Sequence, residues 1–282
     1  MHKFSIITPC YNSEKFISET IDSVINQSII QKGLADLEYI IIDGGSTDKT
    51  IEIIDKKFSC INNANITTKI LTESDNGMYD AIAKGLLIVT GDITAYLNSD
   101  DFYSPYAFEI VNQIFSQYNE IKWLQGSIVF YNIHSQIIRF IDPFRYKNRL
   151  IQKGMYGIGI LPFIQQESIF WRSELNSAIN LCELRKYKYA GDYYLWKTFS
   201  KVTKLHIVWA YLSGFRVHTQ NLTQTIGKSY DDEFISIQDR ATFIDYIISF
   251  YEKIFWSGPQ NMKKRINKKI LKYNVEKDSY LY

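Results

Sequence analysis

The fold is decided by a stretch in which an apolar run ends abruptly in acidic and glycine residues: residues 37–48, LEYIIIDGGSTD. The run over 37–42 has the composition of a buried strand, and Gly44 and Gly45 break it before a segment with helical spacing. A strand followed by a turn and a helix is one unit of a parallel α/β sheet. The stretch therefore predicts a chain of alternating strands and helices.

Three further strands are predicted in the first hundred residues, over 4–8, 68–72 and 93–97, and polar residues follow each of them. Because the carboxyl ends of parallel strands meet at one edge of a sheet, we expect these polar residues to lie close together. In open α/β sheets that edge binds ligands. We therefore expect an α/β fold with a mostly parallel sheet flanked by helices.

The pattern changes after a helix expected over 105–118. The segments 123–131 and 136–141 have the composition of antiparallel strands, which predicts a small antiparallel flap. A basic, glycine-containing stretch over 145–159 follows and indicates a loop.

The later part of the chain returns to strand-like composition over 162–171, and a short amphipathic helix is expected over 192–200. We predict one domain over 1–225, followed by a helical C-terminal extension over 226–282. This extension has six cations and no acid between residues 263 and 272.

Composition excludes several classes of protein. The chain has 282 residues, of which 46% are hydrophobic and 22% charged, so it is globular rather than disordered. Its formal charge of +2 is too small for a nucleic-acid binder with a basic field over the whole domain. Cys10, Cys60 and Cys182 form no CxxC pair, which favours a reducing compartment over a zinc or redox site. We expect neither a signal peptide nor a spanning helix, because no stretch approaches about 18 apolar residues.

Three acidic motifs stand where predicted strands end: residues 43–48, 73–77 and the pair Asp100-Asp101. Each has a purely structural alternative. The first two could be turns that cap helices, and the third an acidic helix start. The pair has a chemical alternative as well, because adjacent carboxylates repel and hard oxygen ligands suit Mg²⁺ or Mn²⁺ on a diphosphate.

Taken in order, four motifs resemble those of the family 2 glycosyltransferases of GT-A fold: ITPCYN over 7–12, DGGSTD over 43–48, DNGMYDA over 75–81 and LNSDD over 97–101. The resemblance covers about residues 3–110 strongly and 160–220 weakly. It is nearest to bacterial enzymes that build capsule, exopolysaccharide or lipopolysaccharide side chains.

The resemblance implies roles toward the nucleotide. Thr8, Pro9 and Tyr11 would line the base pocket, and Asp43 would accept from the imide N–H of uracil or thymine. The remaining nucleotide-binding and DXD-motif positions are Asp75, Gly77, Asn98, Ser99 and Asp100. Asn98 stands where the family usually has an acid, so a bound Mg²⁺ or Mn²⁺ would depend more on Asp100. His218 would contact the metal or the diphosphate, with a structural histidine as the alternative.

The resemblance also implies a catalytic base. The segment AGDYYLW over 190–196 matches the family's position for it, with Gly191 in place of the first acid of an acidic pair. Asp192 would take the proton of the acceptor hydroxyl, and its alternative role is a helix N-cap. Glu183 is the reserve candidate. Residues 165–167 resemble the segment below the acceptor site.

The implied activity is that of a metal-dependent inverting glycosyltransferase of hexosyltransferase type. It would use a nucleotide-sugar donor, UDP-sugar favoured, and a glycan or lipid-linked glycan acceptor. Residues 1–110 would form the nucleotide-sugar half and 111–225 the acceptor half. We expect a cytoplasmic location. The basic C-terminal segment is either a contact with the inner face of the plasma membrane or a solvated helix face.

A catalytically inactive homologue that binds a sugar nucleotide or serves as a scaffold remains open as an alternative. A sugar-nucleotide pyrophosphorylase and a dinucleotide oxidoreductase would both need a glycine-rich loop after the first strand. This chain has Pro9-Cys10-Tyr11-Asn12 there.

Overall fold

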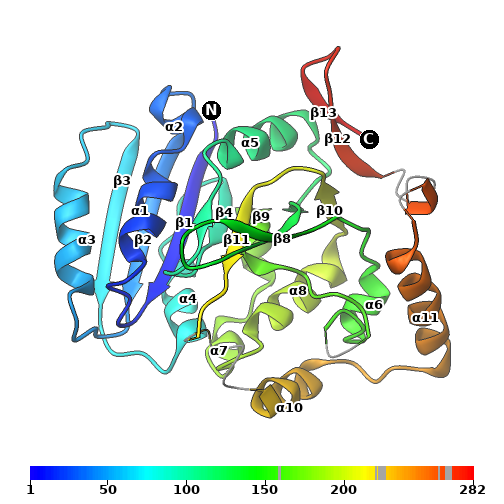
Figure 1. Ribbon diagram of the computed structural model, residues 1–282. Helices are drawn as coiled ribbons and strands as arrows, with labels where there is room; N and C mark the ends of the chain where they lie inside the picture. Colours follow the sequence, from blue (N-terminus) through cyan, green and yellow to red (C-terminus); the bar gives the residue numbers. More distant parts are fainter. Residues whose placement is uncertain (158–159, 220, 222–226, 260, 264–268) are drawn as a thin grey trace.

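A nine-stranded sheet runs through the centre of the protein in a computed structural model that describes residues 1–157, 160–219, 221, 227–259, 261–263 and 269–282 (Figure 1). Its strands are β1 (Lys3–Cys10), β2 (Asp36–Asp43), β3 (Ile66–Thr72), β4 (Ile93–Tyr96), β6 (Trp123–Gln125), β9 (Ile169–Arg172), β10 (Leu205–Val208), β12 (Ile270–Asn274) and β13 (Ser279–Leu281). The order is β13-β12-β10-β6-β9-β4-β1-β2-β3. Only β9 and β13 run antiparallel to their neighbours.

Helices cover both faces of this sheet. They are α1 (Ile17–Ile25), α2 (Ser28–Gln31), α3 (Thr50–Ser59), α4 (Met78–Leu86), α5 (Ala107–Gln117), α6 (Asn148–Gln152), α7 (Leu181–Leu184), α8 (Gly191–Val202), α10 (Gly227–Ile237) and α11 (Phe243–Ser257). Two 3₁₀ turns, η1 (Gln166–Ser168) and η2 (Ser173–Ala178), flank β9. The chain moves in one direction from β1 through β2 to β3 and then returns to β4. Right-handed crossovers therefore place α1 and α3 on one face and α4 on the other.

A second sheet of four strands has the order β5-β11-β7-β8, with β5 (Phe102–Tyr103), β7 (Ile128–Tyr131), β8 (Ile137–Ile141) and β11 (Ser213–Arg216). The β7–β8 hairpin is the antiparallel flap that the sequence predicts, and β11 adds to it parallel to β7. The α/β fold class with a mostly parallel sheet is confirmed. All four strands predicted in the first hundred residues are present, each within two residues of the predicted ends.

Two expectations for the middle of the chain were wrong in detail. The single strand expected over 123–131 is two strands in different sheets, because the chain bends at Gly126, whose Cα lies too close to Leu212 for a Cβ. The loop expected over 145–159 contains the short helix α6, and residues 158–159 lie outside the described part of the chain.

The helical extension expected over 226–282 was wrong for its last residues. Helices α10 and α11 are present, but β12 and β13 form a hairpin after them. β12 pairs parallel with β10, matching Ile207 to Ile270 and Val208 to Leu271, so the end of the chain completes the large sheet. The apolar and aromatic side chains of β12 favour a half-buried strand. No helix in the described part of the chain is both long and apolar enough to cross a membrane.

Candidate active site

The loops that follow the parallel strands lie at one edge of the large sheet. The strand register pairs Cys10 with Asp43 and Asp43 with Thr72, so β1, β2 and β3 end level with one another. The loops are also joined directly, because the Asn12 amide donates to the Ser46 hydroxyl oxygen at 2.8 Å. Motifs that are far apart in the sequence therefore share the ligand-binding edge of an open α/β sheet.

Asp43 ends β2, and its side chain is fully buried. Its carboxylate accepts from the backbone amides of Gly45 and Ser46 at 3.1 and 3.0 Å, from the Ser46 hydroxyl at 2.5 Å and from the Cys10 thiol at 3.7 Å. Gly45 has a φ of +88°, which glycine adopts without a steric penalty. Asp43 thus holds the turn, and its expected bond to a base imide stays a prediction that requires these bonds to be exchanged.

Of the three residues expected to line the base pocket, only Tyr11 reaches the surface, where it is 62% exposed. Thr8 is fully buried, with its hydroxyl 3.2 Å from the Tyr39 hydroxyl, and Pro9 is buried as well. β1 lies between β4 and β2 under helices on both faces, so its side chains point into the core. The side chains of Thr8 and Pro9 thus face the core, their expected contact with a base stays a prediction, and Tyr11 is placed to contact a ligand.

Asp75 and Gly77 precede α4 at the same edge. The Gly77 amide donates to Asp75 Oδ1 at 2.9 Å, and its φ of +122° lies in the region that favours glycine. Burial raises the pKa of Asp75, and the neighbouring Asp80 and Asp43 act in the same direction. Gly44 lies against this carboxylate, since a Cβ there would be 2.8 Å from Asp75 Oδ2. The second and third motifs are therefore in contact.

Asn98 and Ser99 follow β4. The Asn98 amide nitrogen donates to Gln166 Oε1 at 3.2 Å, whereas its Oδ1 is buried without a hydrogen-bond partner among the residues that the structure describes. The Ser99 hydroxyl lies 2.7 Å from that of Ser13. A buried acceptor without a partner is costly unless a ligand or water satisfies it.

Asp100 and His218 meet although 118 residues separate them. His218 Nε2 lies 2.8 Å from Asp100 Oδ2, and Asn221 Nδ2 lies 3.3 Å from the same oxygen. The His218 backbone amide donates to Asn221 Oδ1 at 2.6 Å, which holds this turn. The structure thus brings together the two residues that we expected at a metal.

A divalent cation fits this donor set. Carboxylate oxygen suits Mg²⁺ and Mn²⁺, and imidazole suits several transition metals. No group of three His, Cys, Asp or Glu side chains is arranged to hold a metal within the described ranges of the chain. Mg²⁺ commonly takes one or two carboxylates and completes its shell with substrate phosphates and water. Binding of an ion here would therefore depend on the phosphates of a donor.

Arg216 fixes the Asp100-Asp101 pair, a role that the sequence did not predict. Its buried guanidinium donates from Nε to the Asp100 backbone oxygen at 2.6 Å and from Nη2 to Glu19 Oε2 at 2.6 Å. Its amide donates to Asp101 Oδ1 at 2.7 Å. Burial, with the charge of Asp100 next, raises the pKa of Asp101. The only signal in the sequence was an arginine close to His218 in a strand-like stretch.

Asp192 stands in the first turn of α8, where its Oδ1 accepts from the Tyr193 amide at 2.7 Å. The N-cap of this helix is Ala190, so the alternative role of Asp192 as the cap is wrong. Asp192 is half-buried, and its desolvation raises its pKa to about 6, although hydrogen bonds from Tyr193 and Tyr79 act in the opposite direction. A carboxylate with a pKa close to the working pH is well suited to accept a proton.

Gly191 lies against Tyr79, so the larger acidic side chain that the resemblance led us to expect here would not fit. A Cβ at Gly191 would be 2.4 Å from Cγ of the buried Tyr79 ring. We predict that Gly191→Ala lowers the free energy of unfolding by about 1–3 kcal/mol through overpacking and moves Asp192. Thermal unfolding and transfer rates measure both effects. An unchanged melting temperature would show that the Tyr79 ring moves aside without cost.

Glu233 of α10 holds the segment that leads into α8. Its carboxylate accepts from the backbone amides of Lys188, Tyr189 and Ala190 at 2.8, 2.7 and 2.5 Å. The three donors would otherwise need water. Helix α10 therefore fixes the turn that carries Asp192.

Glu183, the reserve candidate for the base, lies in α7 with its carboxylate already engaged. Lys186 Nζ is 2.6 Å from Oε2, and the Tyr187 hydroxyl is 3.0 Å from Oε1. The hydrogen bond from Lys186, followed by that from Tyr187, lowers the pKa of Glu183. Such a half-buried, paired carboxylate is a weaker base than Asp192.

Glu167 was not singled out as a site residue from the sequence, although it is the only acid between residues 162 and 171. It lies in η1 and is 5% exposed. Burial raises its pKa to about 8, and the charges of Asp100 and Asp192 both contribute. Its Oε2 has no hydrogen-bond partner in the described part of the structure. The charges of Asp100 and Asp192 therefore both act on the buried carboxyl of Glu167.

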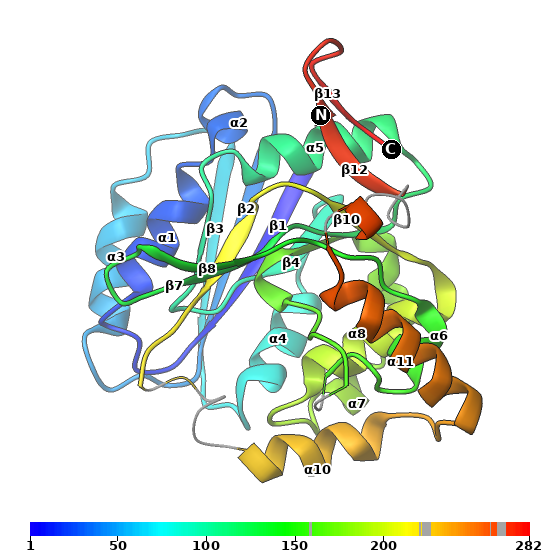
Figure 2. The same ribbon diagram turned by 45° about the vertical axis from the view of Figure 1, so that its right-hand side comes forward.

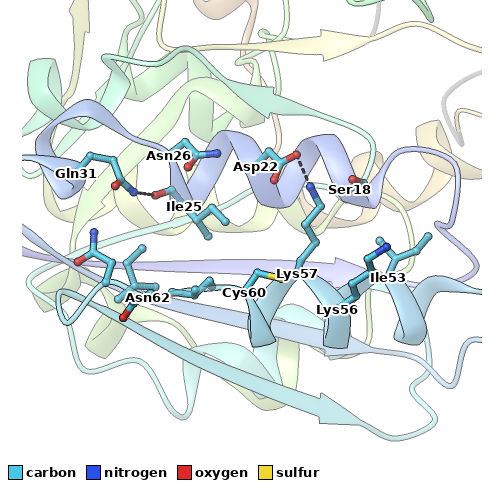
Figure 3. Close-up of a pocket in the computed structure, with 13 residues that line it drawn as sticks. Ser18, Asp22, Ile25, Asn26, Gln31, Ile53, Lys56, Lys57, Cys60 and Asn62 are labelled. Atoms are coloured by element: carbon cyan, nitrogen blue, oxygen red, sulfur yellow. Dashed lines mark hydrogen bonds and ion pairs between the residues drawn. The ribbon is translucent and has the colours of Figure 1, made fainter.

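A groove of about 830 Å³ lies elsewhere, between α1 and α3 (Figure 3). It is lined by Ser18, Asp22, Ile25, Asn26, Gln31, Ile53, Lys56, Lys57, Cys60, Ile61, Asn62, Asn63 and Ile66. Asp22 and Lys57 form an ion pair of 2.5 Å across it. None of the residues that we expected in the site lines this groove, so we place the chemistry at the carboxyl edge of the sheet.

Comparison with known proteins decides the family. The family model described as "Glycosyl transferase family 2" matches residues 5–169, which is more than half of the chain. The chain belongs to glycosyl transferase family 2. Its relatives include an uncharacterized glycosyltransferase of Haemophilus influenzae, 32% identical over 171 residues, which are 60% of this chain and 64% of that protein. The chain covers between 10% and 64% of the length of the first curated relatives that it matches.

Solved structures show the same fold at low sequence identity. TarS 1–349 of S. aureus in complex with UDP-GlcNAc has a TM-score of 0.60 and 16% identity, covering 98% of this chain and 77% of that one. Glucosyl-3-phosphoglycerate synthase of Mycobacterium tuberculosis, in complex with Mn²⁺, UDP and phosphoglyceric acid, has a TM-score of 0.55 and 17% identity, covering 86% and 80%. The glycosyltransferase family and the GT-A type of fold expected from the four motifs are therefore confirmed.

Proposed function

We propose that this protein is an inverting glycosyltransferase that moves a sugar from a nucleotide diphosphate donor to a hydroxyl of a glycan or lipid-linked glycan. The observation that carries the proposal is the meeting of Asp100 and His218, whose Oδ2 and Nε2 atoms lie 2.8 Å apart at the ligand-binding edge of the sheet. This donor set suits a divalent cation beside a diphosphate, and Asp192 in the first turn of α8 is the candidate base. A UDP-sugar is favoured, in line with the UDP and UDP-GlcNAc bound by the two structural neighbours.

In the reaction, the acceptor oxygen forms a bond to the anomeric carbon of the sugar while the bond from that carbon to the diphosphate breaks. The nucleoside diphosphate leaves with the bonding electrons, and Asp192 takes the acceptor proton. Attack from the side opposite the leaving group inverts the anomeric configuration. A carboxylate with a raised pKa, held at a helix start by Tyr193 and Tyr79, is suited to this step.

Asp100 and His218 would hold Mg²⁺ or Mn²⁺, which supplies positive charge to the leaving diphosphate when bound. Arg216 keeps the Asp100 backbone in place, and Asn221 orients His218. Tyr11 would contact the base from the exposed rim, while Asn98 offers an acceptor to the ribose. Without a cation, a diphosphate next to Asp100 would meet mainly like charge.

The two halves of the domain would bind different substrates. Residues 1–110 would bind the nucleotide sugar, and residues 111–225, which include Glu167 and Asp192, would bind the acceptor. A role in bacterial surface polysaccharide synthesis is in keeping with relatives such as the minor teichoic acid biosynthesis protein GgaB of Bacillus subtilis, which is 34% identical over 130 residues. We place the reaction in the cytoplasm, consistent with the free thiols of Cys10, Cys60 and Cys182.

A panel of UDP-, GDP- and dTDP-sugars, each incubated with Mn²⁺ or with a chelator, tests this proposal through the release of nucleoside diphosphate. We expect metal-dependent release from one donor class and none from the others. Asp55→Ala, an exposed change on α3, is the matched control and should leave release unaltered. Donor binding without release, with or without acceptor extracts, would instead favour the inactive, sugar-nucleotide-binding homologue.

Transfer should lose rate as the pH falls below about 6. Burial raises the pKa of Asp192 from its ordinary 3.8 to about 6, so the proton acceptor is lost two units earlier than for an exposed aspartate. Below that pH we expect kcat/KM to drop about tenfold per pH unit. The measurement is product formation over a pH series, with thermal unfolding recorded at each pH. An acidic limb centred near pH 4 would show that Asp192 is not the titrating base.

A further inference from the structure

Helix α11 buries its polar face and exposes its apolar face, which is the reverse of an ordinary surface helix. Its buried positions are polar or charged for the most part: Asp245, Ser249, Glu252 and Trp256. They recur at spacings of four, three and four residues, which places them on one face. A surface helix normally buries its apolar face and exposes its polar one. Here the polar face contacts the rest of the protein.

The inward face is fixed by ion pairs to the segment around α6. Arg149 Nε lies 2.5 Å from Asp245 Oδ1, and Glu252 Oε1 lies 3.0 Å from Arg145 Nη2 and 2.7 Å from Lys147 Nζ. The hydrogen bond from Arg149 holds the pKa of Asp245 below its usual range. A capping box between Thr242 and Asp245 fixes the start of the helix as well. The orientation of α11 is therefore specified by several side chains.

The outward face of α11 is apolar. Seven large side chains on it are between 41% and 79% exposed: Phe243, Ile244, Tyr246, Ile247, Phe250, Tyr251 and Ile254. Figures 1 and 2 both show α11 on the outside of the acceptor half next to α6. A contiguous apolar face of this kind is a mark of a protein or membrane interaction site.

The charges on and after α11 favour an anionic partner. Both acids of α11 face inward, at 0% and 2% exposure for Asp245 and Glu252, and the exposed charge within the helix is Lys253. The stretch from 263 to 272 then adds six cations and no acid to the sequence. A second copy of the chain would bring the same cations against these. An anionic lipid surface instead complements both the cations and the apolar side chains.

We propose that α11 binds this protein to an anionic lipid bilayer, with its apolar face in the interfacial region and its axis in the membrane plane. Lys253 on the helix and two described cations after it, Lys263 and Lys269, would supply the charge that meets the headgroups. This inference goes beyond glycosyl transfer and does not depend on it.

The contact would also orient the candidate active site. α11 is paired through Arg149 to α6, where Asn148 donates to the Ser200 carbonyl of α8 at 2.7 Å. α8 carries Asp192 in its first turn. A rigid connection of this kind would hold the acceptor half at a set height above the membrane, where a lipid-linked glycan presents its hydroxyl.

The test is co-sedimentation of the full chain with vesicles of phosphatidylcholine containing 30% phosphatidylglycerol. We expect Phe243→Ser/Phe250→Ser to lower the partition coefficient at least about tenfold, since each Phe loses its apolar contact with lipid. Leu87→Ser, which changes a side chain that is 62% exposed outside α11, should bind like the wild type. Both variants alter exposed positions, and circular dichroism with thermal unfolding checks that they fold.

Pure phosphatidylcholine vesicles and raised salt should weaken binding of the wild type. Two results would overturn the proposal: equal binding by the α11 variant and the wild type, or a dimer in light scattering that the α11 variant abolishes without any vesicle binding by the wild type. The second result would assign the face to contact between copies of the chain. Because vesicle binding is measured without a donor, a failed transfer assay leaves this test unaffected.

Discussion

Replacing Asp192 with asparagine should lower the rate of glycosyl transfer about 10²- to 10⁴-fold while UDP affinity stays within a few-fold of the wild type. Asparagine keeps the size of the side chain and can accept from the Tyr193 amide through its Oδ1, as Asp192 does at 2.7 Å. It cannot accept the acceptor proton. The helix start is unaffected, because Ala190 is the N-cap and Glu233 binds the amides before it.

Stability gives a second readout for the same variant. Burial raises the pKa of Asp192, so its ionised form is costly in the folded protein at neutral pH. Asp192→Asn removes this charge, and we expect a melting temperature at pH 7 that is no lower than that of the wild type. Glu183→Gln, which alters the half-buried carboxylate paired with Lys186, is the matched control and should retain transfer. If Asp192→Asn retained activity within a few-fold, the base would lie elsewhere, and Glu167 would be the next residue to test.

Replacing Asp100 with alanine should weaken UDP binding in the presence of Mn²⁺ by about 10- to 100-fold, because interactions with a charged group contribute roughly 1.5–3 kcal/mol. The variant should bind UDP as weakly as the wild type does with a chelator. The reason is that Asp100 and His218, 2.8 Å apart, are the donors that fit a cation beside the diphosphate.

Calorimetry of UDP binding with Mn²⁺ and with chelator measures this effect directly. Asp55→Ala on α3 is the control for loss of one surface acid, and it should bind as the wild type does. Equal UDP affinity with and without metal, in both the wild type and Asp100→Ala, would remove the cation from the mechanism. A loss confined to Asp100→Ala, with no metal dependence in the wild type, would make Asp100 a structural residue whose carboxylate holds His218 and Asn221.

The first hundred residues could be predicted from the sequence because polar or turn-forming residues follow each strand closely. β1 ends one residue after Pro9, Gly44 directly follows β2 and Gly77 directly precedes α4. Parallel strands then place the motifs at one edge of the sheet. In this part of the chain the local sequence pattern was sufficient to predict the strands. The direction in which a motif side chain points was not predictable, and Asp43 shows why. Its carboxylate is satisfied by its own turn, through bonds that depend on the folded backbone.

The structure of the second half of the chain depends on contacts between residues that are distant in the sequence. The pairing of Asp100 with Arg216 and His218 and the anchoring of residues 188–190 by Glu233 have no local sequence signal. The sequence predicts a helical extension over 226–282, but it does not say which face of a helix there is outside. That is decided by Arg145, Lys147 and Arg149, which lie about a hundred residues earlier. The strands at the end of the chain were missed because β12 depends on β10 for its partner.

A crystal structure of the chain grown with UDP and Mn²⁺ tests the central claim most directly, since the anomalous signal locates the metal without assumptions about chemistry. We predict one manganese peak within coordination distance of Asp100, with His218 beside it, the diphosphate on the metal and the uracil near Tyr11. Asp192 should face the position that the sugar would occupy. UDP bound without metal at Asp100, or bound in the groove between α1 and α3, would contradict the account.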